Sequence, residues 1–497
     1  MHLQLQFEKQ AITCLRRVKH ETQNQEQTQE LRISDGMPDI GSIIGAWGQV
    51  ILRGKEWQSD MVSVSGGTKV WIQYVPEEGG EIQCVESWLP FQMRWDIPQT
   101  QHDGVIQAQC YLRSVDARST SARKLMVRTN VAVVVCALQE REQELYSPGN
   151  LPEDIQLRSE MYPVELPVEA GEKALALEET LVLPSAAPPV EQLLRYHLQP
   201  QITEIKMVAD KVVFRGNANL HIHYKTAEGG IHSWDLELPF TQYSELQKEY
   251  TDDARVQMFP CVTALEIDRE EDRYQVKTGI VCQYRINQRH MVETVTDTYS
   301  PHRETTPEYQ QLQLPGILET RTETIHPQIS VSLDAMRLAD VQFLPEPFMT
   351  SPGEEGKLYG RFQVLYYDME GQLRTAIQPW EQMYTQDAGS DVTFDSMIYP
   401  SGKTQWTLMS GSVQLSTDMQ LVTESIGGSP IDMVIGIEAG ELRGSDPNRP
   451  SLILRRTENT DLWNLAKKAG STEVAIREAN GLQSDPEPDR MLLIPIE

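Results

Sequence analysis

The sequence lacks the cysteine patterns that mark disulfide-rich and zinc-binding proteins. It contains six cysteines, and none of them forms a Cys-x-x-Cys pair. Scattered cysteines in a chain of this size resemble neither a disulfide framework nor a structural zinc site. Most of them lie in apolar, strand-like runs such as VAVVVCAL, where a free thiol behaves as a small hydrophobic side chain. This usage favours a reducing compartment.

Long apolar runs and an excess of basic residues are also missing. No run of eighteen apolar residues occurs, and the initial MHLQLQFEKQ lacks the pattern of a secretory signal, so we expect neither a transmembrane helix nor secretion. Asp and Glu number 72 against 44 Lys and Arg, for a net charge of −28. Such an acidic surface repels phosphate backbones and anionic lipid head groups. We therefore expect no nucleic-acid partner and no direct membrane insertion.

Catalytic motifs are absent as well. The sequence has no G-x-S-x-G, no H-E-x-x-H and no phosphate-binding glycine loop, which are the motifs that carry a defined catalytic geometry. Serine, histidine and aspartate are present, but a triad depends on spatial geometry. We expect no enzymatic activity, no catalytic residues and no cofactor. An enzyme hidden in this chain would need a deep pocket with converging titratable groups.

What the sequence does contain is an internal repeat. Segments that begin at Pro38 and Pro188 stay in register at an offset of 150, and VWIQYVPEEGG in the first matches LHIHYKTAEGG in the second. A more divergent third copy contains FQVLYYDMEGQLRTAIQPW. All three copies share a tyrosine, three further residues and Glu-Gly, and the tyrosines are Tyr74, Tyr224 and Tyr366.

Each copy has the pattern of β-strands. VWIQYV and LHIHYK alternate large and polar side chains with the period of a half-buried strand, and the following Glu-Gly tolerates the positive φ of a hairpin turn. We predict a mainly β fold of tandem β-sandwich-like repeats followed by a small βααβ domain. Polar, proline-bearing connectors are expected between copies, one of them from Ser147 to Pro189. The expected boundaries are 1–140, 178–300 and 317–425 for the β domains, 440–450 for a linker and 451–497 for the terminal domain.

The terminal stretch DLWNLAKKAGSTEVAIREANGL follows a helical period instead. Its apolar residues recur at i, i+3, i+4 and i+7 on one face of a helix: Leu462, Leu465, Ala466 and Ala469. Thr460 or Asp461 is expected to cap this helix at its start, and Gly470 to end it in the left-handed conformation. A second helix is expected after Ser471 or Thr472, and the apolar runs SLILRR and MLLIPIE are expected to flank the pair as strands.

This terminal unit resembles a LysM domain. The residues that carry the resemblance are Leu462-Trp463, Ile476, Asn480-Gly481-Leu482 and Leu493-Ile494-Pro495. The resemblance implies a groove between the loop after the first strand and the loop after the second helix, which in this family commonly binds N-acetylglucosamine-containing glycans. The implied groove residues are Asn459, Thr460, Asp461, Leu482, Gln483 and Ser484. The first loop departs from the family's usual Ser-Gly-Asp-Thr, because Glu-Asn-Thr-Asp stands there.

The repeats have a resemblance of their own. DGMPDIGSIIGAWGQV, the Tyr-x-x-x-Glu-Gly hairpin and Leu-Pro-Phe resemble the SPOCS domain, also called domain of unknown function 3794. SPOCS repeats followed by one LysM module are similar to the arrangement of SipL-type spore coat morphogenetic proteins. That resemblance implies a non-enzymatic scaffold in the mother-cell cytoplasm at the forespore surface, whose LysM domain docks to a coat-basement morphogenetic ATPase. The alternative is a cell-wall protein that binds peptidoglycan glycans.

Two further sets of residues could have either a binding role or a purely structural one. His221 and His223 lie on one strand face at a spacing that can chelate a metal, but the sequence reveals no third ligand. We therefore favour a polar sheet face and predict no metal site. Trp463 could stack on a sugar ring, but packing within the small domain is the expected role.

Overall fold

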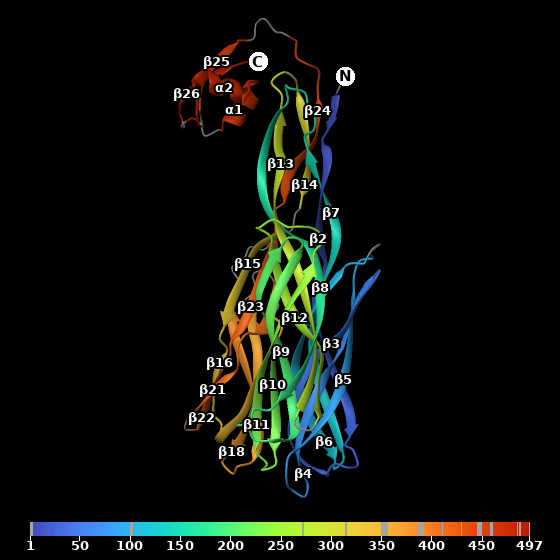
Figure 1. The fold of residues 1–497 in the computed structure, drawn as a ribbon. Helices are drawn as coiled ribbons and strands as arrows, with labels where there is room; N and C mark the ends of the chain where they lie inside the picture. Colours follow the sequence, from blue (N-terminus) through green and yellow to red (C-terminus); the bar gives the residue numbers. More distant parts are fainter. Residues whose placement is uncertain are drawn as a thin grey trace.

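The computed structural model describes residues 3–99, 103–270, 273–313, 316–348, 356–385, 392–409, 411–428, 430–444, 450–457, 461–484, 486 and 489–496. The molecule is elongated, with a broad body of long strands, a narrower stalk and a small helical tail at the end of the stalk (Figure 1). Strands dominate from the first element to the last, so the predicted mainly β fold is confirmed.

Unit 1 of the body is a sandwich of two three-stranded antiparallel sheets. One sheet has the order β3-β4-β5, formed by β3 (Ile40–Gln58), β4 (Met61–Pro76) and β5 (Gln83–Asp96). The other has the order β2-β7-β6, formed by β2 (Glu8–Arg32), β7 (Lys124–Ser147) and β6 (Val105–Ser121). Apolar side chains from the two sheets form one buried core, because alternate residues of each strand point to the same face.

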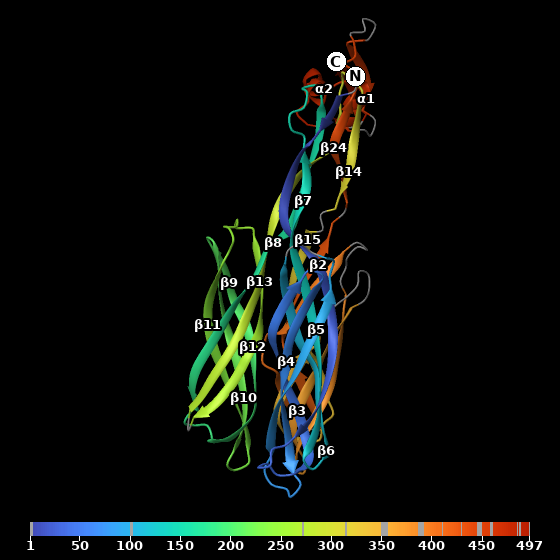
Figure 2. The same ribbon diagram turned by 90° about the vertical axis from the view of Figure 1, so that its right-hand side faces the viewer.

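Unit 2 has the same two-sheet construction. Its first sheet contains β9 (Val190–Val208), β10 (Lys211–Thr226) and β11 (Ile231–Glu245) in the order β11-β10-β9. The facing strands are β12 (Arg255–Glu270), β13 (Arg273–Tyr299) and β8 (Gln156–Val182), in the order β12-β13-β8. A second buried core lies between them. In Figure 2 the strands β9 to β12 lie together at one side of the body.

Unit 3 is built from shorter strands. Its first sheet contains β17 (Ala335–Pro345), β18 (Gly356–Asp368) and β19 (Leu373–Tyr384). Facing it are β15 (Gly316–Ile325), β20 (Thr393–Pro400), β23 (Met419–Gly427) and a small sheet of β16 (Gln328–Val331), β21 (Gln405–Met409) and β22 (Ser412–Ser416). Ile317 of β15 pairs with Glu165 of β8. One six-stranded sheet, β12-β13-β8-β15-β23-β20, therefore runs through units 2 and 3.

The three first sheets share a register around the tyrosine of the Tyr-x-x-x-Glu-Gly pattern. Tyr74 pairs with Ile43, Tyr224 with Leu193 and Tyr366 with Leu338, and in each case a β-bulge follows in the partner strand. The turn glycines Gly79, Gly229 and Gly371 have φ values of 75°, 77° and 77°. The positive φ predicted for these hairpin turns is therefore confirmed.

The three units close on one another in a ring. The ring of Trp71 on β4 lies edge-on to Tyr196 on β9 at a centroid distance of 4.9 Å. His223 on β10 faces Asp340 on β17. The amide of Gln363 on β18 donates to the carbonyl oxygen of Ala46 on β3 at 2.7 Å. The middle strand of each unit's first sheet thus contacts the first strand of the next unit's first sheet.

The stalk continues the long strands of the body. Its own sheet has the order β1-β24-β14, formed by β1 (Leu3–Gln6), β24 (Ile431–Ala439) and β14 (Thr305–Leu312). The ends of β7, β8 and β13 pack beside this sheet, and two small apolar clusters hold the stalk together. Phe7, Val295 and Val434 are at most 5% exposed in the first of these clusters. Both chain termini lie at the stalk end of the molecule (Figure 1).

The tail comprises β25 (Leu452–Arg456), α1 (Leu462–Ala469), α2 (Glu473–Asn480) and β26 (Met491–Pro495). The two strands pair antiparallel. Asp461 caps α1 by accepting a hydrogen bond from the Asn464 N–H, and Thr472 caps α2 in the same way. Gly470 and Gly481 end the helices in the left-handed region. These helix ends agree with the expected capping residues.

The connector expected between Ser147 and Pro189 differs in the structure, because most of it is the long strand β8. Its side chains are polar or charged at many positions, so the sequence there lacks the alternation of apolar and polar residues that predicts a strand. Pairing along the length of β13 satisfies its backbone groups. Within the predicted 440–450 linker, residues 445–449 lie outside the described residues.

Candidate functional site

The predicted groove residues of the tail have different surroundings. Asn459 and Thr460 lie outside the described residues. Asp461 faces the stalk, where a terminal nitrogen of Arg158 lies 2.7 Å from its Oδ2. Leu482 is partly buried against the tail core, whereas Gln483 and Ser484 are exposed to solvent. Of the four predicted groove residues that the structure describes, Gln483 and Ser484 therefore present their side chains freely to a ligand.

The tail is held on the stalk by side chains at the end of β13. The Trp463 indole N–H donates to Oδ2 of Asp297 at 2.7 Å, and Lys467 Nζ lies 2.7 Å from Oδ1 of the same carboxylate. The Tyr299 ring lies edge-on to Trp463 at 4.7 Å, and its hydroxyl donates to the Ser471 carbonyl oxygen at 3.0 Å. The core of the tail is therefore completed by a residue from outside it.

Trp463 is not available for stacking on a sugar in this arrangement. It is 6% exposed and belongs to the apolar cluster that Tyr299 joins. The expected packing role agrees with this burial, but the contact extends from the small domain to the stalk. Nothing in the sequence pattern of the tail indicated Asp297 and Tyr299 as its contacts, since they lie in a strand far away along the chain.

Charge pairing across this contact lowers the pKa of two aspartates. Burial alone would raise the pKa of Asp297, but hydrogen bonds from Lys467 and Trp463 outweigh burial and hold the pKa below its ordinary value. Burial likewise opposes ionisation of Asp461, yet hydrogen bonds from the Asn464 N–H and from Arg158 lower its pKa. Both carboxylates are therefore stabilised in their charged form, Asp297 by side chains of the tail and Asp461 in part by Arg158 of the stalk.

The two-stranded sheet of the tail exposes an apolar outer face. Leu492 and Ile494 point inward and are fully buried, so alternate residues point outward. Four outward side chains are apolar, and they are exposed by 48% for Leu452, 58% for Leu454, 50% for Met491 and 38% for Leu493. Arg456 lies opposite Met491 at one end of this face. Leu454 and Leu493 are direct cross-strand partners. The helices lie between this sheet and the stalk, so the outer face points away from the molecule (Figure 1).

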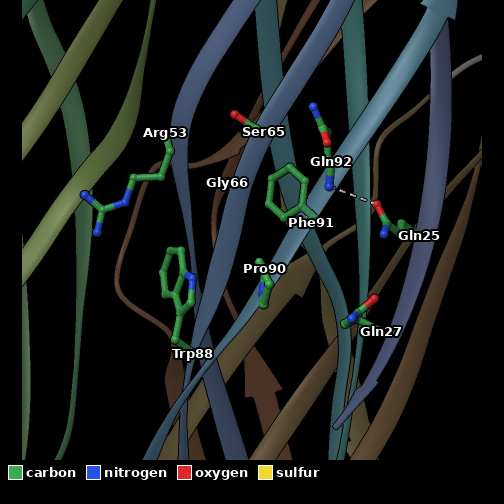
Figure 3. Close-up of a pocket in the computed structure, with 9 residues that line it drawn as sticks. All are labelled: Gln25, Gln27, Arg53, Ser65, Gly66, Trp88, Pro90, Phe91 and Gln92. Carbon is green, nitrogen blue, oxygen red and sulfur yellow. Dashed lines mark hydrogen bonds between the residues drawn. The ribbon is translucent and has the colours of Figure 1, made fainter.

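An open groove lies on unit 1, along the edge between β5 and β2 (Figure 3). It has a volume of about 720 Å³ and is lined in part by Trp88, Arg53 and the glutamines Gln25, Gln27 and Gln92. The Gln25 side chain accepts a hydrogen bond from the Gln92 N–H at 3.2 Å, so it covers the edge of β5. Amide and aromatic side chains dominate the lining, which suits contact with a surface rather than proton transfer.

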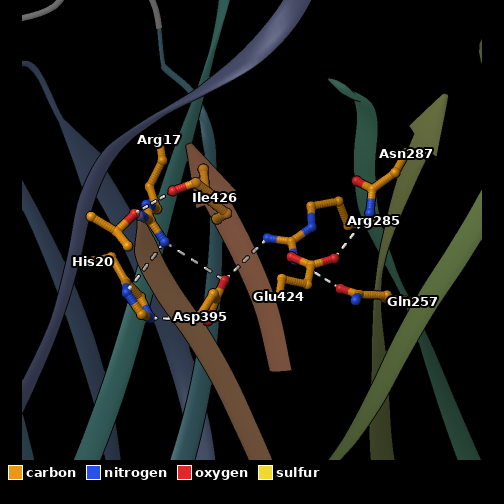
Figure 4. A network of polar contacts seen from close by, with 9 residues as sticks. Arg17, His20, Gln257, Arg285, Asn287, Asp395, Glu424 and Ile426 are labelled. Atoms are coloured by element: carbon orange, nitrogen blue, oxygen red, sulfur yellow. Dashed lines mark hydrogen bonds and ion pairs between the residues drawn. The ribbon is translucent and has the colours of Figure 1, made fainter. Parts of the chain in front are cut away.

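A buried polar network joins the three units (Figure 4). Arg285 of β13 pairs with Asp395 of β20 and with Glu424 of β23. His20 of β2 lies 3.1 Å from Asp395, and the Asn287 amide donates to Glu424 at 3.1 Å. Titratable groups thus converge here, as an enzyme would require, but the adjoining cavity has a volume of only about 10 Å³. That is room for about one water molecule and not for a substrate.

The charged groups of this network shift one another's pKa values. Burial alone would raise the pKa of Asp395, but the neighbouring His20 and Arg285 outweigh burial and lower it. The pKa of Glu424 is raised, because burial outweighs the effect of Arg285. Burial tends to lower the pKa of Arg285, and the two carboxylates raise it above its ordinary value. The network therefore links strands of all three units through buried ion pairs.

The six cysteines are free thiols, and two of them, Cys136 and Cys282, are buried. Burial raises the pKa of Cys261 to about 11 and of Cys136 to about 12. A thiol with such a pKa is protonated at neutral pH and is a poor nucleophile. These residues pack as small apolar side chains, as the sequence indicated.

Comparison with known proteins gives one family match. The family model described as SipL, SPOCS domain, matches residues 189–269, which correspond to β9 to β12 of unit 2. No curated protein matches the chain, and no solved structure matches it. The match supports the resemblance of unit 2 to the SPOCS domain of SipL-type proteins, a family linked to sporulation. None of the helices in the described ranges has the length and apolar character needed to cross a membrane.

Proposed function

We propose that this chain is a scaffold of spore coat assembly, made of three SPOCS-like units and a LysM-like tail. The family match to unit 2 supports the SPOCS assignment. The shared tyrosine registers, bulges and turn glycines extend that support to units 1 and 3. The strand, helix, helix, strand order of the tail supports a LysM-like fold. The chain acts in the mother-cell cytoplasm at the forespore surface.

The tail is the docking head of this scaffold. The observation that carries the proposal is the exposed apolar face of Leu452, Leu454, Met491 and Leu493. A contiguous apolar face on a strongly acidic protein favours a protein partner, because apolar contact does not depend on the sign of the surface charge. The partner proposed is the coat-basement morphogenetic ATPase that the SipL resemblance implies. Gln483 and Ser484 lie in the proposed second contact region, the LysM groove.

Substitution of the apolar face tests this function. A Leu454→Lys and Leu493→Lys double variant of the full chain should lose co-purification with the ATPase and become diffuse during sporulation. Val182→Lys on the body is the matched control, since Val182 is 63% exposed and lies outside the tail. Unchanged capture by the double variant would contradict docking through this face.

A second pair of variants separates the groove from the sheet face. Gln483→Ala with Ser484→Ala should weaken capture if the groove contributes. Sedimentation of the full chain with purified peptidoglycan tests the alternative function. Retention on peptidoglycan that these groove substitutions abolish, together with no affinity for the ATPase, would favour the glycan-binding protein and overturn the scaffold.

A further inference from the structure

Two histidines and an aspartate from different units converge at the junction of units 2 and 3. His221 and His223 are two residues apart on β10, so both rings leave the same face of the strand. Asp340 reaches them from β17. The Nε2 atoms of the two histidines lie 2.7 Å apart, and Asp340 Oδ2 lies 3.1 Å from that of His223. All three potential ligand atoms lie within 4.8 Å of one another.

The sequence predicts only a polar sheet face here, because it reveals no third ligand. The fold supplies that ligand from a residue more than a hundred positions further along the chain. The His223 side chain is 1% exposed and that of Asp340 is 8% exposed, whereas the His221 side chain is 22% exposed. The cluster is therefore enclosed, with access from solvent on the His221 side.

Neighbouring charged side chains hold His221 and Asp340 in place, as outer residues commonly do for the ligands of a metal site. Asp235 on β11 contacts Nδ1 of His221, and Lys403 lies 3.2 Å from the other oxygen of that carboxylate. A carboxylate on Nδ1 keeps a proton on that nitrogen. The Nε2 atom shares a hydrogen bond with Nε2 of His223 in the metal-free chain, and an ion that replaces the shared proton would bind both nitrogens. Arg195 contacts Asp340 and so fixes the orientation of the third ligand.

We propose that His221, His223 and Asp340 bind one divalent transition-metal ion and that this ion clasps unit 2 to unit 3. Two imidazole nitrogens and one carboxylate oxygen are a donor set suited to Zn²⁺. Three protein ligands leave a further position that water can fill.

The charges around the cluster predict which metals bind. Arg195 and Lys403 balance the carboxylates of Asp340 and Asp235, so the site offers no excess of negative charge. Ca²⁺ and Mg²⁺ bind where several hard oxygen ligands gather, and this site does not attract them. Affinity comes from the imidazole lone pairs, which favour Zn²⁺ and its transition-metal neighbours.

Of the three equivalent junctions, as far as the structure describes them, this one carries the group of potential ligands. By strand register, Trp71 and Gln363 stand where unit 2 has His221, and Gln73 and Leu365 stand where it has His223. Neither alternative pair supplies two imidazoles. The proposed metal site therefore distinguishes the junction of units 2 and 3 from the other two junctions of the ring.

Metal binding by the full chain, prepared without a polyhistidine tag, tests the proposal. After chelation and dialysis against Zn²⁺, elemental analysis should find one bound equivalent per chain, and His221→Gln should lose it. His326→Gln is the matched control, since His326 also pairs with an aspartate but its side chain is 70% exposed. Among the described residues it belongs to no group of potential metal ligands. Asp235→Asn should weaken Zn²⁺ affinity by about 10- to 100-fold, because it removes the group that orients a ligand.

Two further measurements on the unsubstituted chain do not depend on any variant folding. Co²⁺ in the site should give a visible absorption band, and Zn²⁺ should raise the thermal unfolding temperature whereas Ca²⁺ and Mg²⁺ should not. The absence of a bound equivalent in the unsubstituted chain, or equal retention by folded His221→Gln, would overturn the proposal. Binding of Ca²⁺ with similar affinity would overturn the assignment of the donor chemistry.

Discussion

At the scale of single residues, two glycines control how closely an aromatic ring packs on the middle strand of each of the first two units. Gly66 pairs with Phe91, and Gly216 pairs with Phe240. A Cβ added at Gly216 would lie 2.3 Å from the backbone oxygen of Gln201 and 2.5 Å from Phe240 Cζ. Backbone cannot yield as a flexible side chain does, so both glycines are required by close approach.

Substitution of Gly216 should therefore destabilise the protein. We expect Gly216→Ala to lower the free energy of unfolding by about 1–3 kcal/mol, the usual range for overpacking a close-packed core. Urea denaturation measures the change. Gly36→Ala is the control, because nothing lies within 4 Å of a Cβ added at Gly36. Equal stability of the two variants would contradict the packing argument.

Burial also determines how much two arginine ion pairs contribute to stability. Arg285→Met should cost about 3–5 kcal/mol of unfolding free energy, because it leaves Glu424 and Asp395 buried without their shared cation. Arg128→Met should cost no more than about 1 kcal/mol, since Arg128 and Glu26 are both more than half exposed and solvent screens such pairs. Chemical denaturation of both variants checks the difference, and comparable losses would refute it.

At the scale of elements, the docking of α1 depends on Tyr299 at the end of β13. Tyr299→Ala removes a ring from the core of the tail and one hydrogen bond to Ser471. We expect amide hydrogens of α1 to exchange markedly faster in this variant, as measured by hydrogen exchange and mass spectrometry. Tyr359→Ala, at a residue 44% exposed on β18, should leave α1 unchanged. Unchanged protection of α1 in both variants would mean that the tail does not depend on the stalk.

The same contact should respond to acid. Because the pKa of Asp297 is lowered in the docked state, its contribution is fully present above the ordinary value of 3.8 and is lost as pH falls through the lowered pKa. A chain labelled with 5-fluorotryptophan should show the Trp463 resonance, assigned by its loss in Trp463→Phe, shifting below about pH 4. The Trp406 resonance serves as the control. A Trp463 shift centred well above that pH would contradict the assignment to Asp297.

The elements differ in how much of their structure the sequence predicted. The helices of the tail have local signals, and Asp461, Gly470 and Thr472 cap or end them as expected. β2 and β8 have no such signal, because their faces carry glutamine, glutamate and lysine at many positions. These strands are determined by long-range pairing with β7 and β13. A local pattern cannot reveal pairing of this kind.

At the scale of the whole molecule, ring closure makes the units depend on one another. Buried charges such as Arg285 and Asp340 find their partners in a neighbouring unit. We therefore expect calorimetry to show the three units unfolding in one main transition. Removal of unit 3 should destabilise units 1 and 2, since it leaves Arg195 and Arg285 without carboxylate partners. Three separate transitions, or unchanged stability of the shortened chain, would show that the units are independent.

The ring itself could not be predicted from the sequence. The repeat indicates similar units, but the contacts between units use unlike residues at equivalent positions. Trp71 meets Tyr196, His223 meets Asp340, and Gln363 meets a backbone carbonyl. No shared pattern marks these positions as contacts, and for that reason the third ligand of the histidine pair was visible only in the fold. Of the predicted groove, the sequence could indicate the loops but not which of their residues the stalk covers.

The long pairing of β2 with β7 also gives the molecule two distant poles. It runs from Glu8 opposite Ser147 in the stalk to Arg32 opposite Lys124, and a ladder of 25 residues at ~3.3 Å per residue is roughly 80 Å long. A fluorescent protein fused to either terminus would lie at the same end as the proposed docking face. One inserted between β6 and β7 would instead mark the opposite tip, and two such reporters imaged together would reveal which way the molecule stands on the surface that holds it.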